Sequence, residues 1–334
     1  MTSRISYATL AFPMSDFRAY SGEEFFSATF PKRDFLVENI LREKDSVIVV
    51  GGPKAGKSIL LFQLICSLTS QHPFLDKYEV KRPCTVSYLQ LEGEIADYQD
   101  RMIRMAQALE VNPSNLNYIY SSPLNLTDPK EGNQLCETIK RYHEKLDVLI
   151  IDPLYFAFQG SLSDDAIVRR FLGNIRVIKD FLGCAVIIVH HTHKVRFDSG
   201  SGLVIDEGDA ASFGSVFFHA WPDHILLLTS NAHTGLRSLT CGTQRSGAIV
   251  SSETLRLIQP APLYFEPTAT AVTALKPIEL LDYLKRSGPS TYKEIQAGMG
   301  MSSSTFYFTV KPLIMQKLVL KDNSGKLIRY SSAG

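Results

Sequence analysis

The stretch VIVVGGPKAGKSILL, residues 47–61, sets the expectations for the whole chain. Four hydrophobic residues run into a glycine-rich turn, and an apolar segment with helical spacing follows. Residues 51–58 match the pattern G-x-x-x-x-G-K-[ST], in which loop amides and the first turn of a helix surround phosphate groups. The motif lies between a predicted strand and a predicted helix, which is the context it requires. The stretch therefore predicts a binding site for a nucleoside triphosphate rather than a chance glycine turn.

The residue types in this loop assign the phosphate and metal contacts. Lys57 would reach the β- and γ-phosphates, and the hydroxyl of Ser58 would coordinate magnesium. The predicted cofactors are therefore ATP and Mg²⁺. The predicted binding residues are Gly51, Gly52, Pro53, Lys54, Ala55, Gly56, Lys57, Ser58 and Ile59.

Two carboxylates complete the expected hydrolytic site. Asp152 ends the apolar run in LDVLIIDPL, residues 146–154, and we predict that it positions the magnesium together with Ser58. Glu92 ends the strand-like run in CTVSYLQLEGE, residues 84–94, and we predict that it is the general base on a strand next to the phosphate loop. Glu94 is the alternative, although a carboxylate there also suits the start of the next helix.

Three histidines follow another apolar run in AVIIVHHTHKV, residues 185–195. No Cys or carboxylate cluster accompanies them, so zinc is disfavoured. We predict that His191 senses the γ-phosphate through a hydrogen bond. His190 and His193 have the alternative of being satisfied by nearby carbonyl groups.

The hydrophobic pattern predicts an α/β fold. Apolar runs at 47–50, 85–91, 118–121, 148–151 and 185–190 alternate with helical patterns at 58–70, 94–110, 130–145 and 166–181. Runs that are apolar on both faces belong to a parallel sheet covered by helices. Three further short strands are expected at 225–229, 236–241 and 254–258. We therefore predict a core with a mainly parallel central sheet.

The last part of the chain reads as a second domain. A proline-rich stretch, residues 261–276, is predicted to be a linker. Helical patterns at 277–286, 292–297 and 302–317, then strands at 318–321 and 327–330, give the order of a winged helix-turn-helix domain over 277–334. Residues 1–30 are expected to form an irregular lead-in, and residues 31–260 the main domain.

Composition limits the remaining classes of protein. The chain is 45% hydrophobic and 21% charged, and no run approaches 18 apolar residues, so we expect a cytoplasmic protein with no membrane partner. Its five cysteines are scattered, which favours a reducing compartment. From residue 276 onward nine Lys or Arg stand against four Asp or Glu, which favours an anionic partner for this end.

The order of glycine loop, strand-end glutamate, IIDP and VHHTHK resembles the RecA-like P-loop ATPases of the plasmid RepA hexameric helicase type, over roughly residues 30–260. The resemblance implies ATP hydrolysis, a homo-hexameric ring and DNA as partner. It places Glu92 at the catalytic glutamate and His191 at a polar sensor. In TCGTQRSGA, residues 240–248, it places Arg245 at an arginine finger that acts on the neighbouring subunit's nucleotide. Thr243 stands where the family has a lysine, and the alternative for Arg245 is a solvated hairpin arginine.

Two regions are candidates for contacting DNA. By resemblance, the segment after the histidines would line a central channel, with Lys194 and Arg196 touching a single strand; the alternative is a solvated loop. The C-terminal domain would contact duplex DNA; the alternative is a protein-binding module. Its predicted DNA contacts are Ser303, Tyr307, Lys311, Lys326 and Arg329.

Three functions follow from these observations. The first is a ring-forming DNA helicase or replication ATPase of a plasmid or mobile element. The second is an ATP-dependent DNA-binding regulator or loader that switches assembly without unwinding. The third, a metabolic P-loop kinase, is the least favoured, because a kinase has no use for the histidines, the late arginine or a winged helix.

Overall fold

The computed structural model describes residues 19–121, 124–191, 197–198, 202–203, 214–230, 235–244, 252–258, 263–268, 271–300, 306, 310, 313–314, 318–322 and 329–332. The chain divides into two compact units. The first comprises Met1–Thr192 and Phe213–Pro267, and the second comprises His193–Ser212 and Thr268–Gly334. No helix among these described residues is long and apolar enough to span a lipid bilayer.

A nine-stranded sheet runs through the described part of the first unit. Its strands are β3 (Ser46–Gly51), β4 (Val86–Gln90), β5 (Leu116–Tyr120), β6 (Val148–Asp152), β7 (Ala185–His191), β10 (His224–Ser230), β11 (Arg237–Gln244), β12 (Ser252–Ile258) and β13 (Tyr264–Pro267). The spatial order is β13-β12-β11-β10-β3-β7-β6-β4-β5. The neighbours from β5 to β10 pair in parallel, and β11, β12 and β13 extend the sheet in antiparallel fashion. The predicted, mainly parallel α/β core is therefore present.

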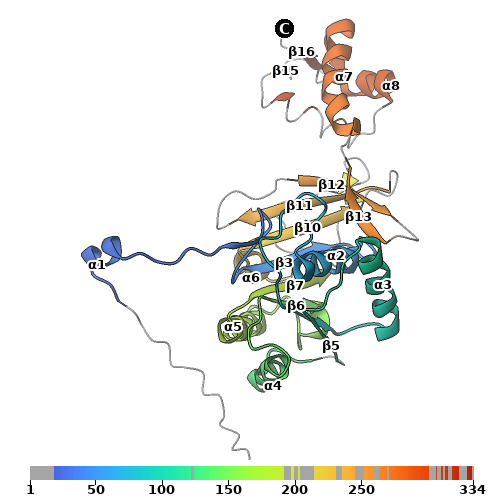
Figure 1. The fold of residues 1–334 in the computed structure, drawn as a ribbon. Coiled ribbons are helices and arrows are strands. Elements are labelled where there is room, and N and C mark those ends of the chain that lie inside the picture. The colour runs from blue at the N-terminus through green and yellow to red at the C-terminus, as the bar shows by residue number, and fades with distance from the viewer. Residues whose placement is uncertain are drawn as a thin grey trace, which may run out of the picture. The chain divides into compact units, whose positions relative to one another are not determined.

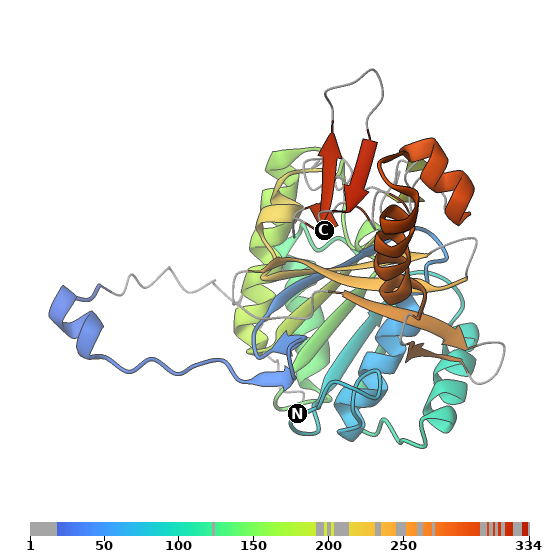
Figure 2. The same ribbon diagram turned by 90° about the horizontal axis from the view of Figure 1, so that it is seen from above.

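Helices cover both faces of the sheet. They are α2 (Lys57–Ser70), α3 (Ile95–Ala108), α4 (Pro129–Lys140), α5 (Asp165–Leu182) and the short α6 (Phe217–Ala220), with a 3₁₀ turn at Leu154–Phe156. Apolar residues of α2 and α3 pack against one face, and those of α4, α5 and α6 pack against the other. Figures 1 and 2 show α2 and α3 on one side of the sheet and α5 on the other.

The central strands are buried on both faces because their side chains alternate between these two cores. In β3, Val47 and Val49 join the core under α2, whereas Ile48 and Val50 join the core under α5. This arrangement explains why the strands appear in the sequence as continuous apolar runs.

Some predicted boundaries are wrong. The predicted linker, residues 261–276, contains β13 and the start of a helix at Ala271, so the first unit continues to Pro267. Proline is tolerated there because β13 is an edge strand whose last residue is Pro267. The predicted irregular lead-in contains α1 (Gly22–Ser27), whose start is stabilised by a capping box between Ser21 and Glu24.

The remaining strands of the described residues form two short pairs and one three-stranded sheet. They are β1 (Phe35–Val37) with β2 (Leu41–Arg42), and β8 (Phe197–Asp198) with β9 (Gly202–Leu203), each antiparallel, and a three-stranded sheet in the second unit.

The second unit has its own small core. Besides β8 and β9, its elements are α7 (Ala271–Ser287), β14 (Ser290–Thr291), α8 (Tyr292–Met299), β15 (Val319–Asp322) and β16 (Arg329–Ser332). The strands form an antiparallel sheet in the order β14-β16-β15. Apolar residues of α7, such as Leu280 and Leu284, pack with Ile295 and Phe306. Of the predicted third helix at 302–317, the described residues 306, 310, 313 and 314 are helical.

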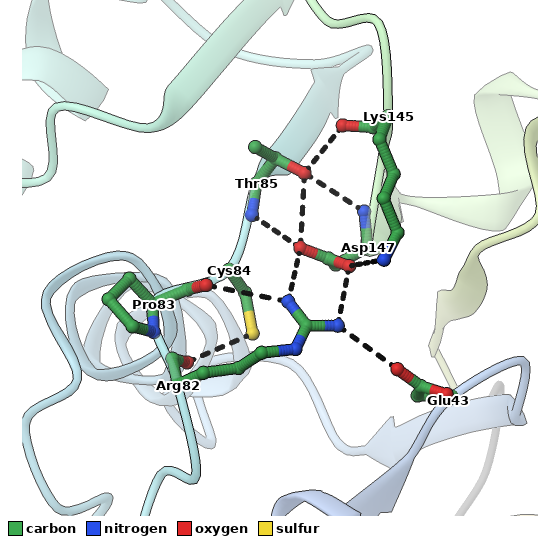
Figure 3. A network of polar contacts seen from close by, with 7 residues as sticks. All are labelled: Glu43, Arg82, Pro83, Cys84, Thr85, Lys145 and Asp147. Carbon is green, nitrogen blue, oxygen red and sulfur yellow. Dashed lines mark hydrogen bonds and ion pairs between the residues drawn. The ribbon is translucent and has the colours of Figure 1, made fainter. Parts of the chain in front are cut away.

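A polar network connects the start of β4 to the start of β6, at the ends of these strands that lie opposite to Gln90 and Asp152 (Figure 3). Asp147, which precedes β6, accepts two hydrogen bonds of 2.9 Å from the Arg82 guanidinium and one of 2.9 Å from the amide of Thr85. Arg82 also bonds Glu43 at 3.0 Å. Burial raises the pKa of Asp147, but the hydrogen bonds from Arg82 and Thr85 outweigh it, so that the pKa is lower than usual. The network thus fixes the relative positions of two strands that end near the phosphate loop.

We expect Asp147→Asn to lower the free energy of unfolding by about 1–2 kcal/mol at pH 7, because the donors of this partly buried network lose a charged acceptor. The pKa of Asp147 is lower in the folded chain than in the unfolded chain. Its stabilisation is therefore present above about pH 4 and is lost as the pH falls through the folded-state pKa. Urea unfolding of both proteins between pH 3 and pH 8 measures this difference.

The matched control is Asp100→Asn, because Asp100 pairs with Arg104 on the exposed surface of α3. We expect a change below about 0.5 kcal/mol for it. An Asp147→Asn loss as small as that of the control would show that the network does not stabilise the sheet.

Candidate active site

The phosphate loop joins β3 to α2, as the sequence predicts, and both of its outer glycines lack room for a side chain. A Cβ atom on Gly51 would lie 2.4 Å from the carbonyl oxygen of Leu228 in β10. Gly56 has φ +100°, and its Cβ would lie 2.8 Å from the ring of Phe265 in β13. The loop can therefore approach its neighbouring strands only with glycine at these two positions.

Lys57 is buried at the start of α2, with 5% of its surface exposed. Its Nζ donates hydrogen bonds to the carbonyls of Gly51 at 2.8 Å and Gly52 at 3.0 Å. Burial lowers the pKa of Lys57 to about 8, against the opposite effect of the carboxylates of Asp152 and Glu92. A cation held in this loop and next to two carboxylates is placed to meet the charge of a triphosphate.

Ser58 and Asp152 come together as predicted. The Ser58 hydroxyl donates to Asp152 Oδ2 at 3.1 Å, and the hydroxyl of Tyr88 in β4 donates to the same oxygen at 2.6 Å. Burial raises the pKa of Asp152 to about 6, although both hydroxyl groups lower it. A hydroxyl and a carboxylate oxygen are the hard ligands that Mg²⁺ prefers. The pair therefore fits a magnesium ion, which would offset phosphate charge when bound.

Glu92 acts electrostatically on Asp152, but the strand that it follows does not lie where the sequence predicted. The strands next to β3 are β10 and β7, and β4 is separated from β3 by β7 and β6. Glu92 follows β4 in a turn whose carbonyls at Glu92 and Gly93 accept hydrogen bonds from Gln90 at 2.6 and 3.3 Å. The prediction that the strand before Glu92 lies next to the phosphate loop is wrong. The order of the strands is set by how the whole sheet packs, which a local pattern does not show. Glu92 nevertheless contributes to the electrostatics of both Lys57 and Asp152.

His191 ends β7 directly beside the loop, because it pairs in register with Gly51. Its Nε2 lies 3.8 Å from Glu92 Oε1. His190 points to the opposite face and is 2% exposed against the ring of Phe218. Glu94 is the N-cap residue of α3 and makes no side-chain capping bond. Of the two carboxylates and the two described histidines, the structure thus brings Glu92 and His191 together.

The sequence did not single out three residues that support the site, namely Tyr88, Gln63 and Phe265. Tyr88 holds Asp152, as described above. Gln63 in α2 accepts a hydrogen bond from the amide of Phe265 at 2.8 Å and donates one to its carbonyl at 2.9 Å. These contacts join residues up to 202 positions apart, so no local pattern could have revealed them.

Most predicted DNA contacts and the predicted arginine finger lie outside the described residues. They are Arg245, Lys194, Arg196, Ser303, Tyr307, Lys311 and Lys326. Arg329 is described and lies on β16. Its guanidinium donates to the carbonyl of Pro289 at 3.0 Å and lies 3.9 Å from Glu294, while about half of the side chain is exposed.

The family follows from a comparison with known domains. The profile of the AAA domain family (AAA_25) matches residues 14–196, which is more than half of the chain. The chain belongs to this family of P-loop ATPases. ATPase activity and the general use of ATP and Mg²⁺ follow from that membership and agree with the site described above.

No curated protein matches the chain. Among solved structures, the crystal structure of the RadB recombinase is similar to it with a TM-score of 0.48 and 16% sequence identity. The similarity covers 68% of this chain and 91% of that one.

Proposed function

We propose that this ATPase is a DNA motor, a ring-forming replicative helicase or replication ATPase of a plasmid or mobile element. The observation that supports this proposal most directly is the position of β7. Its last residue, His191, is paired with Gly51 of the phosphate loop and lies 3.8 Å from Glu92. In the sequence it is followed at once by the segment that carries Lys194 and Arg196. One strand end therefore connects the site of hydrolysis to the proposed channel segment.

The hydrolytic step follows from the chain's own residues. The loop amides and Lys57 bind the phosphates, and Glu92 accepts a proton from the attacking water. The water oxygen forms a bond to the γ-phosphorus while the bond to the bridging oxygen breaks, which leaves ADP and phosphate. His191, next to Glu92, changes its contacts when the γ-phosphate leaves. Arg245 of a neighbouring subunit stabilises charge in the transition state, which is why the proposal includes a homo-hexamer.

The second unit supports a DNA partner. Its order of α7, β14, α8, a helical segment around residues 306–314, β15 and β16 is compatible with a winged helix-turn-helix. We propose that its third helix enters a major groove with Ser303 and Tyr307. Lys311, Lys326 and Arg329 would bind phosphates in this arrangement, in keeping with the basic excess after residue 276.

The separate core of this unit also favours a second candidate function. A domain with its own apolar centre and a basic excess can bind duplex DNA without any translocation along a strand. The same ATPase site would then switch assembly on DNA, as in an ATP-dependent regulator or loader.

The test is the ATPase rate per subunit of the full chain, measured over a range of protein concentrations with no DNA, with single strands and with duplex. The proposed motor predicts a rate that rises with protein concentration, since Arg245 acts between subunits, and rises again with single strands. A response to duplex alone would contradict the helicase and support the switch. Hydrolysis that ignores both forms of DNA and the protein concentration would contradict both functions.

A further inference from the structure

A guanidinium group on β11 contacts the phosphate loop, although it belongs to none of the motifs of the site. Arg237 Nε donates a hydrogen bond of 3.0 Å to the carbonyl oxygen of Ala55, in the middle of the loop. Its Nη1 donates to the carbonyls of Gly235 at 2.6 Å and Leu236 at 3.4 Å. Within the described part of the chain, no carboxylate forms an ion pair with this guanidinium. These hydrogen bonds of the side chain all go to backbone carbonyls, one of which is in the phosphate loop.

The bond to Ala55 fixes the direction of the next amide. The peptide unit between Ala55 and Gly56 is planar and trans, so its C=O and N–H groups point in opposite directions. Because Arg237 holds the oxygen, the N–H of Gly56 points away from Arg237. Among the described residues no backbone carbonyl accepts this N–H. It is one of the loop amides that surround phosphate in this motif.

The free loop would otherwise have access to another orientation. Glycine at position 56 allows the peptide to rotate, since its φ of +100° is one of several values open to this residue. Rotation of the Ala55–Gly56 peptide would bring a carbonyl oxygen towards the phosphates in place of an N–H. The ring of Phe265 in β13 lies against Gly56 and leaves little room on that side. A phenyl ring has no hydrogen-bond donor, however, so it cannot fix the Ala55 carbonyl as Arg237 does.

We propose that Arg237 is a positioning residue of the ATPase, which orients the Gly56 amide towards the phosphates by holding the Ala55 carbonyl. The inference rests on the nucleotide site of the proposed function, but not on DNA binding or on a ring. Loop amides contact phosphate oxygens in the ground state and in the transition state alike. Loss of the orientation therefore raises the KM for ATP and leaves kcat nearly unchanged.

Two substitutions separate the bond to Ala55 from the other properties of the side chain. In glutamine, Nε2 is as many bonds from Cα as Nε is in arginine, so Arg237→Gln keeps a donor for the Ala55 carbonyl. Arg237→Met has a methyl carbon at that position and no donor. Both variants lose the positive charge and the contacts of Nη1. The matched surface control is Arg256→Met, because Arg256 is an exposed residue on the neighbouring strand β12.

The experiment measures the Kd of each full-length protein for ADP, its KM and kcat with ATP, and its melting temperature without nucleotide. We expect Arg237→Met to bind ADP about 10-fold more weakly than Arg237→Gln, a loss that corresponds to about 1.4 kcal/mol. The KM should rise by a similar factor, with kcat within about twofold. Arg256→Met should bind like the wild-type protein.

Equal ADP affinities of folded Arg237→Met and Arg237→Gln would overturn the proposal. If Arg237→Met does not fold, Arg237→Leu takes its place in the same comparison. If neither apolar variant folds while Arg237→Gln does, the role of Arg237 is structural and the proposal is overturned as well. A wild-type protein that binds no ADP would overturn the nucleotide site itself, which the wild-type titration distinguishes from a failure of Arg237 alone.

Discussion

Replacing Glu92 by glutamine should reduce kcat for ATP by about 10²–10⁴-fold, the usual contribution of a positioned general base. Glu92 is partly exposed, lies 3.8 Å from His191, and acts electrostatically on Lys57 and Asp152. An amide of the same shape cannot accept the proton of the attacking water. Nucleotide affinity should stay within a few-fold of wild type, since the phosphates are bound by the loop.

Steady-state kinetics together with an ADP titration test this expectation. The matched control is Glu94→Gln, two residues further on, because Glu94 is an exposed N-cap residue with no side-chain capping bond. We expect nearly wild-type kcat for it. If Glu94→Gln were the inactive variant and Glu92→Gln the active one, the assignment of the general base would be wrong.

Replacing Lys57 by alanine should reduce both nucleotide binding and hydrolysis, with a loss of about 10²–10³-fold in kcat/KM, the range found when one charge-stabilising donor is removed. The ammonium group is buried in the loop, where it donates hydrogen bonds to the carbonyls of Gly51 and Gly52, and in this motif the lysine contacts the phosphates. Alanine is compatible with the first turn of α2 but lacks the ammonium group that would bind the triphosphate.

The control for Lys57→Ala is Lys32→Ala, which removes the same charge from an exposed position outside the loop. We expect less than about a threefold effect there, because an exposed charge is screened by solvent. Thermal melting of both variants shows whether they fold. A folded Lys57→Ala protein with wild-type ATPase would mean that hydrolysis takes place without the predicted phosphate contact.

Much of the fold could be predicted because it depends on local patterns. The apolar runs that became β3, β6 and β7 are buried on both faces, and burial on both faces leaves a continuous hydrophobic signature. The start of α2 is set by the loop motif itself. The linker prediction failed because the prolines around β13 indicate a loop locally. In the folded chain this segment pairs with β12, and Gln63 bonds the amide and the carbonyl of Phe265.

The catalytic pairings show the same division. Ser58 and Asp152 could be expected to meet, because a phosphate loop needs a carboxylate for its magnesium and an apolar strand ends in one. The strands next to β3 could not be predicted in the same way, because the residues of one strand do not show which strands lie beside it in the sheet. Tyr88 was also hidden, because a tyrosine in a buried strand looks like any core aromatic residue until its hydroxyl has a partner.

The sequence was enough to predict the phosphate loop, the carboxylates around it and the α/β class, because these depend on residue types at fixed short spacings and on hydrophobic periodicity. Other features became visible only in the assembled fold. They are the strands that adjoin β3, the position of His191 next to Glu92, and the contacts of Arg237 and Phe265 with the loop. A local pattern could not show these contacts, because they join residues far apart in the chain. Their geometry is fixed only when the sheet is assembled and its two cores are packed.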